Sequence, residues 1–455
     1  MKLTVIGGGG VRSMFLAKSI AQKASQLGIN KLVFMDNDEE KLRIYAGMAK
    51  HVAKLLCPEL DFTLTTDAVE AVRDADYVIT TIRVGGDSMR VRDERIALSL
   101  GILGQETTGA AGFSFAMRSI PALAEYCELI KKHSKPDVKV FNFTNPAGLV
   151  SQALRDMGYD FTYGVCDAPS GMLHSFSKLY GVEPEAVKGE LFGLNHLSYF
   201  DRIMLNGKNI VGELAENHLA YKDTDMRYFE KKLVRELGYI PNEYLYYFYY
   251  REKAVANILA ADLTRGEQIE LINTRMTAQL RDMDVENSFE DCLAVFEKYY
   301  GMRENSYMAS ETGVKRENAW HFDPYSKDSG GYAGVALKYI EIMQSGKSDS
   351  MILCTTNNGA IEGLLDSDVV EITCDINPDG CCVPHKFTNI KPECLELIKR
   401  MKLYERDAAK AIVARNKKAA VSALMLHPLV NSYSLACQLV KEYVELNADF
   451  SGGWQ

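Results

Sequence analysis

Short apolar runs alternate with amphipathic stretches along the first 165 residues. Residues 3–6 form an apolar run that ends at glycines, residues 12–27 carry apolar side chains at helical spacing, and Lys31–Met35 is a second strand-like run that ends at Asp36. This is the pattern of a βαβ unit. Further strands are predicted at residues 62–64, 77–82, 138–143 and 161–165. The alternation predicts an α/β fold with a Rossmann-like, doubly wound parallel sheet.

The pattern changes after about residue 165. The Asn206-Gly207 pair between two apolar runs predicts a β-hairpin. Helical patterns follow at residues 226–237, 267–282, 286–299 and 397–446. We therefore expect two domains, a Rossmann domain over residues 1–165 and a mixed α/β domain over residues 166–455. Because no low-complexity or Pro-rich linker separates them, they should share an extensive interface, with a site in the cleft between them.

Composition narrows the class of partner. The 455 residues are 47% hydrophobic and 25% charged, as in ordinary folded proteins. Lys and Arg number 52 against 61 Asp and Glu, and the net charge of −9 disfavours nucleic acid, although one or two Arg side chains suffice for a single phosphate. No long apolar run predicts a membrane span, and the apolar stretch before Gly7 is too short for a signal peptide. We expect a cytoplasmic protein.

The first predicted strand is joined to the first helix by four glycines, Gly7, Gly8, Gly9 and Gly10. Here glycine backbone can approach a pyrophosphate, and the helix N-terminus can meet its charge. The match to G-x-G-x-x-G is imperfect, since Arg12 stands at the third glycine position. Asp36 ends the second strand, where a carboxylate binds ribose hydroxyls and repels a 2′-phosphate. We expect NAD in preference to NADP; a plain strand-to-helix turn is the alternative.

A cysteine and a histidine are candidate metal ligands. The ten cysteines are scattered without a CxxC pair, and most should be reduced core residues. Cys166 follows a predicted strand and precedes the carboxylate Asp167, and His196 ends the stretch GLNH. A thiolate and an imidazole bind divalent transition ions, and two protein ligands leave positions open for vicinal oxygens of a substrate. A small core cysteine and a hydrogen-bonded interior histidine are the alternatives.

Three further groups of residues are candidates for contact with a substrate. Asn145 follows the strand at residues 138–143, at the edge where open α/β sheets bind ligands, although a plain Asn-Pro turn is equally consistent. The tyrosine-rich run at residues 244–250 is typical of aromatic core, but a tyrosinate beside a cation can act as a base. The candidate phosphate or hydroxyl clamps, with a solvated surface role as the alternative, are Arg83, Arg90, Arg95, Arg118 and Arg265.

Taken in order, these stretches resemble glycoside hydrolase family 4, the NAD- and manganese-dependent glycosidases, over nearly the whole chain. The matching segments are VIGGGG with MDND, the stretch from IRVGG to DER at residues 82–95, GQETTGAAG, MRSIP, NFTNPAG, GVCDAPSG, GLNH, PNEYL, the TR of LTRGE, NNGAIEGL and LHPLVNS. Their common order makes the resemblance far more specific than any one motif.

The resemblance implies roles for the candidates. Cys166 and His196 would bind Mn²⁺ or another divalent transition metal, and Tyr244, in the P-x-x-Y-L pattern, would be the catalytic base. The expected substrate contacts are Arg90, Asn145 and Arg265. In this scheme NAD takes hydride from C3 of the sugar, Tyr244 removes the C2 proton, the aglycone leaves, and water addition and hydride return complete a net hydrolysis. The resemblance also implies a homodimer or homotetramer.

The segment after Cys166 bears on the substrate. Asp167 and Pro169 resemble the branches that act on 6-phosphorylated glucosides, whereas the galactosidase-like and glucuronidase-like branches carry His after the cysteine. Asp167 resembles the α-specific enzymes, in which a carboxyl can protonate the leaving oxygen. NFTNPAG and LHPLVNS, however, resemble the β-specific enzymes. We expect a 6-phospho-α-glucosidase with Asp167 as a second catalytic residue, and a 6-phospho-β-glucosidase is the alternative.

Two hypotheses from other classes compete with this one. An NAD-dependent 2-hydroxy-acid dehydrogenase, similar to lactate or malate dehydrogenase, explains the glycines and Asp36 but leaves Cys166 and His196 without a role. A regulator that senses NAD without catalysis leaves the polar residues of the expected cleft unexplained. Stoichiometric accumulation of NADH would identify the dehydrogenase, because a redox-neutral glycosidase recycles its cofactor.

Overall fold

The computed structural model describes residues 1–316, 319–326 and 331–455. Six parallel strands form a sheet in the order β3-β2-β1-β4-β5-β6. They are β1 (Lys2–Ile6), β2 (Lys31–Met35), β3 (Asp61–Thr65), β4 (Tyr77–Thr80), β5 (Lys139–Asn142) and β6 (Thr162–Gly164). This is the strand order of a doubly wound nucleotide-binding sheet, so the predicted fold class is confirmed.

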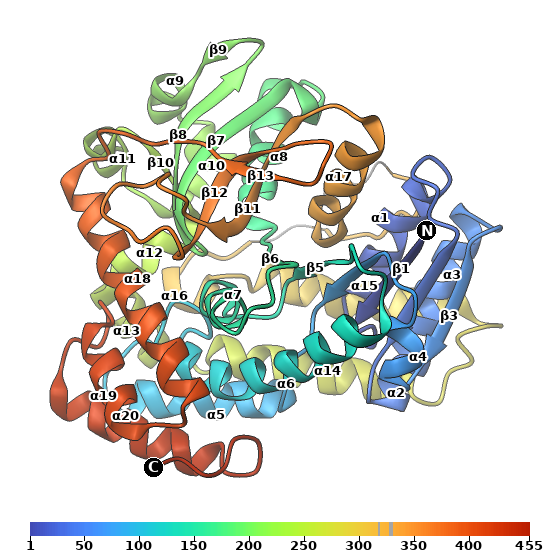
Figure 1. Ribbon diagram of the computed structural model, residues 1–455, viewed down its shortest axis with the longest axis horizontal. Coiled ribbons are helices and arrows are strands. Elements are labelled where there is room, and N and C mark those ends of the chain that lie inside the picture. The colour runs from blue at the N-terminus through green and yellow to red at the C-terminus, as the bar shows by residue number, and fades with distance from the viewer. Residues whose placement is uncertain (317–318, 327–330) are drawn as a thin grey trace.

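Helices cover both faces of this sheet (Figure 1). On one face lie α1 (Ser13–Ala24), α3 (Gly47–Leu56) and α17 (Tyr332–Ser345), and on the other lie α4 (Ala68–Val72), α6 (Ala111–His133) and α7 (Ala147–Asp156). The central strands are therefore buried on both faces. This explains why β1 and β2 are continuous apolar runs without a polar alternation.

The sheet continues past residue 165. β11 (Asp349–Thr356) pairs antiparallel with β6 through Cys354 and Gly164, and β12 (Val369–Ile376) and β13 (Cys382–Pro384) extend the sheet to nine strands. Gly164 permits this pairing because a Cβ there would come 2.8 Å from the Cβ of Cys354. The division into two domains after residue 165 stays a prediction, since both parts of the chain build this sheet.

A second, smaller sheet lies beside the first, in the upper part of Figure 1. β7 (Val187–Leu194) and β8 (Leu197–Leu205) form a long hairpin, and β10 (Ile240–Pro241) pairs with β8. The hairpin predicted at Asn206-Gly207 is present, although its second strand, β9, is only Lys208–Asn209.

Two helical predictions were wrong in extent. Residues 397–446 do not form one continuous helix: the chain turns at Arg415 and Asn431, which both have positive φ, and Asn416 and Ser432 cap the helices that follow. The three helices are α18 (Pro392–Val413), α19 (Lys417–Leu426) and α20 (Tyr433–Leu446). Within residues 226–237 the α-helix, α11, covers only Lys231–Leu237. The other two predicted helices correspond to α14 (Arg265–Leu280) and α15 (Phe289–Asn305).

α18, α19 and α20 pack with α5 (Gly86–Ser99) and α6 in the lower part of Figure 1. We call these five helices the helical base. None of the helices within the described ranges combines the length and the apolarity of a membrane span.

Candidate functional site

A cavity of about 850 Å³ opens where β1 and β4 end. Its wall joins the glycine turn and residues 81–87 to side chains from the second half of the chain. Of the predicted site residues, the wall contains Gly7, Gly9, Gly10, Asp36, Arg90, Asn145, Tyr244 and Arg265. The structure thus brings the predicted cofactor turn, base and substrate contacts to one place. Asp167 and His196 adjoin this wall through its residues Arg12 and Tyr244, and Cys166 directly precedes Asp167.

The glycine turn packs tightly on the neighbouring strands. A Cβ at Gly7 would come 2.6 Å from the backbone oxygen of Thr81, and a Cβ at Gly8 would come 2.6 Å from the Cβ of Phe34. The carboxylate of Asp36 accepts a hydrogen bond from the N–H of Gly9 (2.9 Å), so it also holds the turn. In the described part of the chain no side chain caps the N-terminus of α1. That end of the helix can therefore bind an anion.

The two predicted metal ligands lie on different elements. Cys166 lies between β6 and α8 (Ala168–Tyr180), and its Sγ accepts a hydrogen bond from the N–H of Ala168 (3.4 Å). His196 lies in the two-residue turn between β7 and β8, and burial lowers its pKa to about 3, so the imidazole is neutral. Its buried Nδ1 has no hydrogen-bond partner among the described residues. The same residues contain no group of three or more His, Cys, Asp or Glu that could hold a metal.

Tyr244 connects the histidine to the cavity. Its ring stacks on the imidazole of His196, with the centroids 3.7 Å apart and the planes 6° apart. The hydroxyl of Tyr307 lies 3.1 Å from that of Tyr244 and 3.4 Å from Oε1 of Glu243, within hydrogen-bond reach of both. Burial raises the pKa of Tyr244, and the neighbouring Glu243 and Cys166 raise it further. A tyrosine in these surroundings needs a positive charge nearby to act as a base.

Asp167 reaches the cavity through an arginine. It precedes the first turn of α8, and its carboxylate lies 3.7 Å from the guanidinium of Arg12. Arg12 lines the cavity beside the glycine turn. The residue that breaks the G-x-G-x-x-G pattern thus joins the predicted cofactor turn to the predicted metal segment.

Four of the five candidate arginines are paired with carboxylates. Arg90 lies between Glu94 (2.8 Å) and Glu106 (3.2 Å), and Arg83 also pairs with Glu106 (2.5 Å). These two arginines hold the pKa of Glu106 well below its usual range. The other two pairs, on the surface and in the core respectively, are Arg95 with Glu267 and Arg118 with Asp93.

The fifth candidate, Arg265, has no carboxylate partner among the described residues. It donates hydrogen bonds to Oγ of Ser306 (2.5 Å) and to the backbone oxygen of Arg303 (3.1 Å). The side chain of Arg303 lines the same wall. Burial and the positive charges of Arg12 and Arg265 lower the pKa of Arg303 to about 10. Two crowded cations that form no ion pair with a carboxylate among the described residues make a place for an anion.

Arg303, Tyr307 and Glu311 are among the residues of this wall that were not predicted from the sequence. They belong to α15 and the segment after it, and helical periodicity alone does not tell which side of a helix faces a distant cavity.

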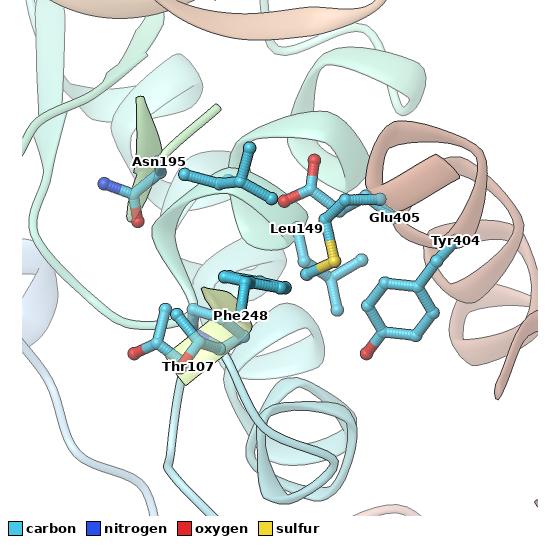
Figure 2. A pocket seen from close by; sticks show the side chains of 11 residues that line it. Thr107, Leu149, Asn195, Phe248, Tyr404 and Glu405 are labelled. Carbon is cyan, nitrogen blue, oxygen red and sulfur yellow. The ribbon is translucent and has the colours of Figure 1, made fainter. Parts of the chain in front are cut away.

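A second, much smaller cavity borders Asn195, the residue before His196 (Figure 2). Thr107, Leu149, Phe248, Tyr404 and Glu405 also line it. Oγ1 of Thr107 and Oδ1 of Asn195 are buried, and neither has a hydrogen-bond partner in the described ranges. This cavity is too small for a sugar.

Comparison with known proteins identifies related enzymes. The model of the family 4 glycosyl hydrolases matches residues 2–182, and the model of the family's C-terminal domain matches residues 191–430. The 6-phospho-β-glucosidase BglT of Thermotoga maritima is 30% identical over 99% of both chains. The phospho-α-glucosidase PagL of Clostridium acetobutylicum is 26% identical over 98% of both chains.

Two solved structures are similar to this chain. The 6-phospho-β-glucosidase from Thermotoga maritima, solved with manganese, NAD⁺ and glucose-6-phosphate, has a TM-score of 0.81 at 28% identity and covers 99% of both chains. A lactate dehydrogenase from a deep-sea metagenome has a TM-score of 0.51 at 13% identity, covering 90% of this chain and 98% of its own. The second likeness concerns the fold alone, and it confirms the predicted dehydrogenase-like architecture.

Proposed function

Because the chain belongs to family 4 of the glycosyl hydrolases, we propose that it hydrolyses 6-phosphorylated glucosides with NAD and Mn²⁺ as cofactors. One observation carries the proposal: the glycine turn, Tyr244 and the two arginines Arg265 and Arg303 share one cavity. The names of relatives with both anomeric specificities, and the glucose-6-phosphate in the structure from Thermotoga maritima, support a phosphorylated glucoside. A cytoplasmic homodimer or homotetramer remains our expectation.

The residues present fit NAD. Gly7, Gly8, Gly9 and Gly10 form a tight turn before the uncapped N-terminus of α1, as a pyrophosphate requires. Asp36 lines the same cavity and would accept hydrogen bonds from the ribose hydroxyls.

The residues also fit a transition metal. Cys166 offers a thiol and His196 a neutral imidazole, and the buried Nδ1 of His196 has no protein partner in the described part of the chain. Two protein ligands would leave coordination positions for oxygens of the sugar.

The side chains around the cavity would divide the chemistry among them. When bound, NAD supplies reversible oxidation at C3 of the sugar, and Mn²⁺ polarises the C2 and C3 oxygens. Tyr244 takes the proton from C2, and a cation beside His196 would oppose the rise in pKa that burial causes in this tyrosine. Asp167, held beside Arg12, protonates the leaving oxygen.

The 6-phosphate would lie between Arg265 and Arg303, two arginines of the cavity wall that form no ion pair with a carboxylate in the described residues. Arg90 and Asn145 line the same cavity and remain candidates for contact with sugar hydroxyls. Arg90 is held by two carboxylates, so we expect it to orient the wall more than to bind the phosphate.

We propose the α anomer because the carboxylate of Asp167 lies 3.7 Å from the guanidinium of Arg12, which lines the cavity. The specific observation that favours the β anomer is sequence identity. The β-specific relative is 30% identical to this chain, and the α-specific relative is 26% identical.

The test is a panel of nitrophenyl glucosides, α and β, with and without a 6-phosphate, assayed with NAD, Mn²⁺ and a thiol reductant. We expect turnover of 6-phosphorylated substrates alone, without accumulation of NADH. Equal turnover of unphosphorylated glucosides, or stoichiometric NADH without sugar release, would overturn the proposal. Preference for the β-linked substrate, or α activity that survives Asp167→Asn, would favour the β-specific alternative.

A further inference from the structure

We propose that Glu371 is a positioning residue that sets His196 and Tyr244 relative to Cys166. The inference rests on the metal site proposed above. Glu371 lies on β12, in the sheet, and only 1% of its surface is exposed. It does not line the large cavity, so it would act through the residues that it holds.

The carboxylate of Glu371 holds both flanks of the histidine turn. Oε1 accepts a hydrogen bond from Nδ2 of Asn195 (3.0 Å), and Oε2 accepts one from Oγ of Ser198 (2.8 Å). His196 lies between them with φ of 62°, a left-handed conformation that a residue other than glycine keeps only when its surroundings hold it. The other side of Asn195 borders the small cavity of Figure 2. Among the described residues, Glu371 is therefore the one side chain that fixes this amide.

The same carboxylate is linked to the turn that carries Tyr244. Oγ of Ser198 accepts a hydrogen bond from Nδ2 of Asn242 (3.4 Å). Oδ1 of Asn242 accepts one from the backbone N–H of Tyr244 (3.0 Å) and caps the short helix Glu243–Leu245. The stacked rings of His196 and Tyr244 are thus held through one buried carboxylate.

Strand register relates Glu371 to Cys166. Glu371 pairs with Cys354 on β11, and Cys354 pairs with Gly164 on β6. Cys166 follows Gly164 by two residues. The β7–β8 hairpin belongs to a different sheet. The hydrogen bonds of Glu371 therefore join the turn of His196 to the main sheet, at the position where Glu371, Cys354 and Gly164 lie side by side on neighbouring strands.

The test measures binding of Mn²⁺ alone to the full chain, from the electron paramagnetic resonance signal of free Mn²⁺. Glu371→Leu leaves Asn195 and Ser198 without their acceptor, and we expect about 10- to 100-fold weaker binding. Glu371→Gln should restore binding close to that of the wild type, because its oxygen can accept from Asn195 while its amide donates to Ser198.

A matched control is available on the same strand. Oγ1 of Thr373 accepts a hydrogen bond from the N–H of Leu191 (2.8 Å) and donates to the oxygen of Gly189 (3.3 Å), so it holds the same hairpin away from its turn. Thr373→Val should lower the melting temperature and leave Mn²⁺ affinity unchanged. Weakening by Thr373→Val as large as that by Glu371→Leu would overturn the proposal, and so would Glu371→Gln binding as weakly as Glu371→Leu.

Asn195→Ala covers the case in which Glu371→Leu does not fold. It removes one of the two bonds, and we expect a smaller loss of affinity; unchanged affinity would overturn the proposal. Cys166→Ser and His196→Ala separate this result from the proposed function. If both bind Mn²⁺ like the wild type, the metal site itself is wrong, whereas normal binding by Glu371→Leu alone rejects only the positioning role.

Discussion

The helical base and the candidate site both bury titratable side chains, but the helical base pairs its buried charges with one another. The buried pairs of the helical base and its neighbours are Arg118 with Asp93 (2.6 Å), Lys402 with Glu405 (2.5 Å) and Arg406 with Asp368 (2.5 Å). At the site, Nδ1 of His196 and Oε2 of Glu243 are buried without hydrogen-bond partners in the described ranges. Burial of charge alone therefore does not mark function in this protein; the candidate site combines buried groups that lack partners with a large cavity.

Energetics explains the difference. A buried polar group without a partner costs about 1–3 kcal/mol. Residues of the helical base must satisfy one another, whereas a ligand can supply the missing partners at the site. We therefore expect substitutions at the site to change activity more than stability, and substitutions in the helical base to do the reverse.

The largest effect is expected for Tyr244→Phe. The variant keeps the ring that stacks on His196 but loses the hydroxyl, so kcat should fall about 10²- to 10⁴-fold. NAD binding and the melting temperature should stay unchanged. Exchange of the C2 proton with deuterated solvent is the direct measurement. Tyr247→Phe is the matched control, because Tyr247 is buried in the same wall. Lost exchange in Tyr247→Phe and normal exchange in Tyr244→Phe would mean that the base is Tyr247.

Arg118→Met should show the opposite behaviour. Arg118 donates to both oxygens of Asp93 and to Oδ1 of Asn447 (2.6 Å). Removing the cation leaves Asp93 buried and unpaired, which should lower the free energy of unfolding by about 3–5 kcal/mol. Urea unfolding measures the loss, and a second substitution, Asp93→Asn, should recover part of it. Reduced affinity for the phosphorylated substrate at unchanged stability would instead make Arg118 a phosphate clamp.

Much of the fold could be predicted because its signals are local. The strand at Lys31–Met35 is an uninterrupted apolar run, and the glycines before α1 mark the turn. Cys166, His196 and Tyr244 could be predicted as site candidates because each stands in a motif of the family.

Residues that act through distant partners could not be predicted. The pairing of Arg90 depends on Glu106, and the role of Arg303 depends on how α15 lies against the glycine turn. Glu371 leaves a weaker signal in the sequence, a carboxylate within the largely apolar strand Val369–Ile376. Its buried partners Asn195, Ser198 and Cys354 are distant in sequence and become visible only in the structure.

Glu243→Gln should increase stability at neutral pH. Burial and the nearby Asp225 raise the pKa of Glu243 from 4.5 to about 8. Between these values the folded protein keeps a proton that the unfolded chain loses, so the free energy of unfolding falls as pH rises through this window. The glutamine does not titrate, and its advantage over the wild type should grow by about 3–4 kcal/mol from pH 5 to pH 8. Chemical unfolding at each pH measures it; a constant difference would show that Glu243 is ionised throughout.

The smallest expected effect is on the pH dependence of stability and concerns His427, a histidine that we assign a structural role, in contrast to His196 at the site. His427 belongs to the LHPLVNS motif, and its Nδ1 accepts a hydrogen bond from the N–H of Leu429 (3.1 Å). Burial, assisted by Arg400, lowers its pKa to about 3, as burial does for His196. Because the unfolded chain binds a proton below about pH 6.5 and the folded protein does not, stability is lost as pH falls from about 6.5 towards 3.

His427→Asn tests this, because asparagine keeps an acceptor for Leu429 and does not titrate. Between pH 7.5 and pH 5 the wild type should lose about 2 kcal/mol more of its free energy of unfolding than the variant. Activity at pH 7.5 should be unchanged, since the partner of His427 is the backbone of its own turn. Equal losses in the two proteins would show that His427 titrates near its ordinary pKa. A loss of Mn²⁺ binding in His427→Asn would place this histidine with the site.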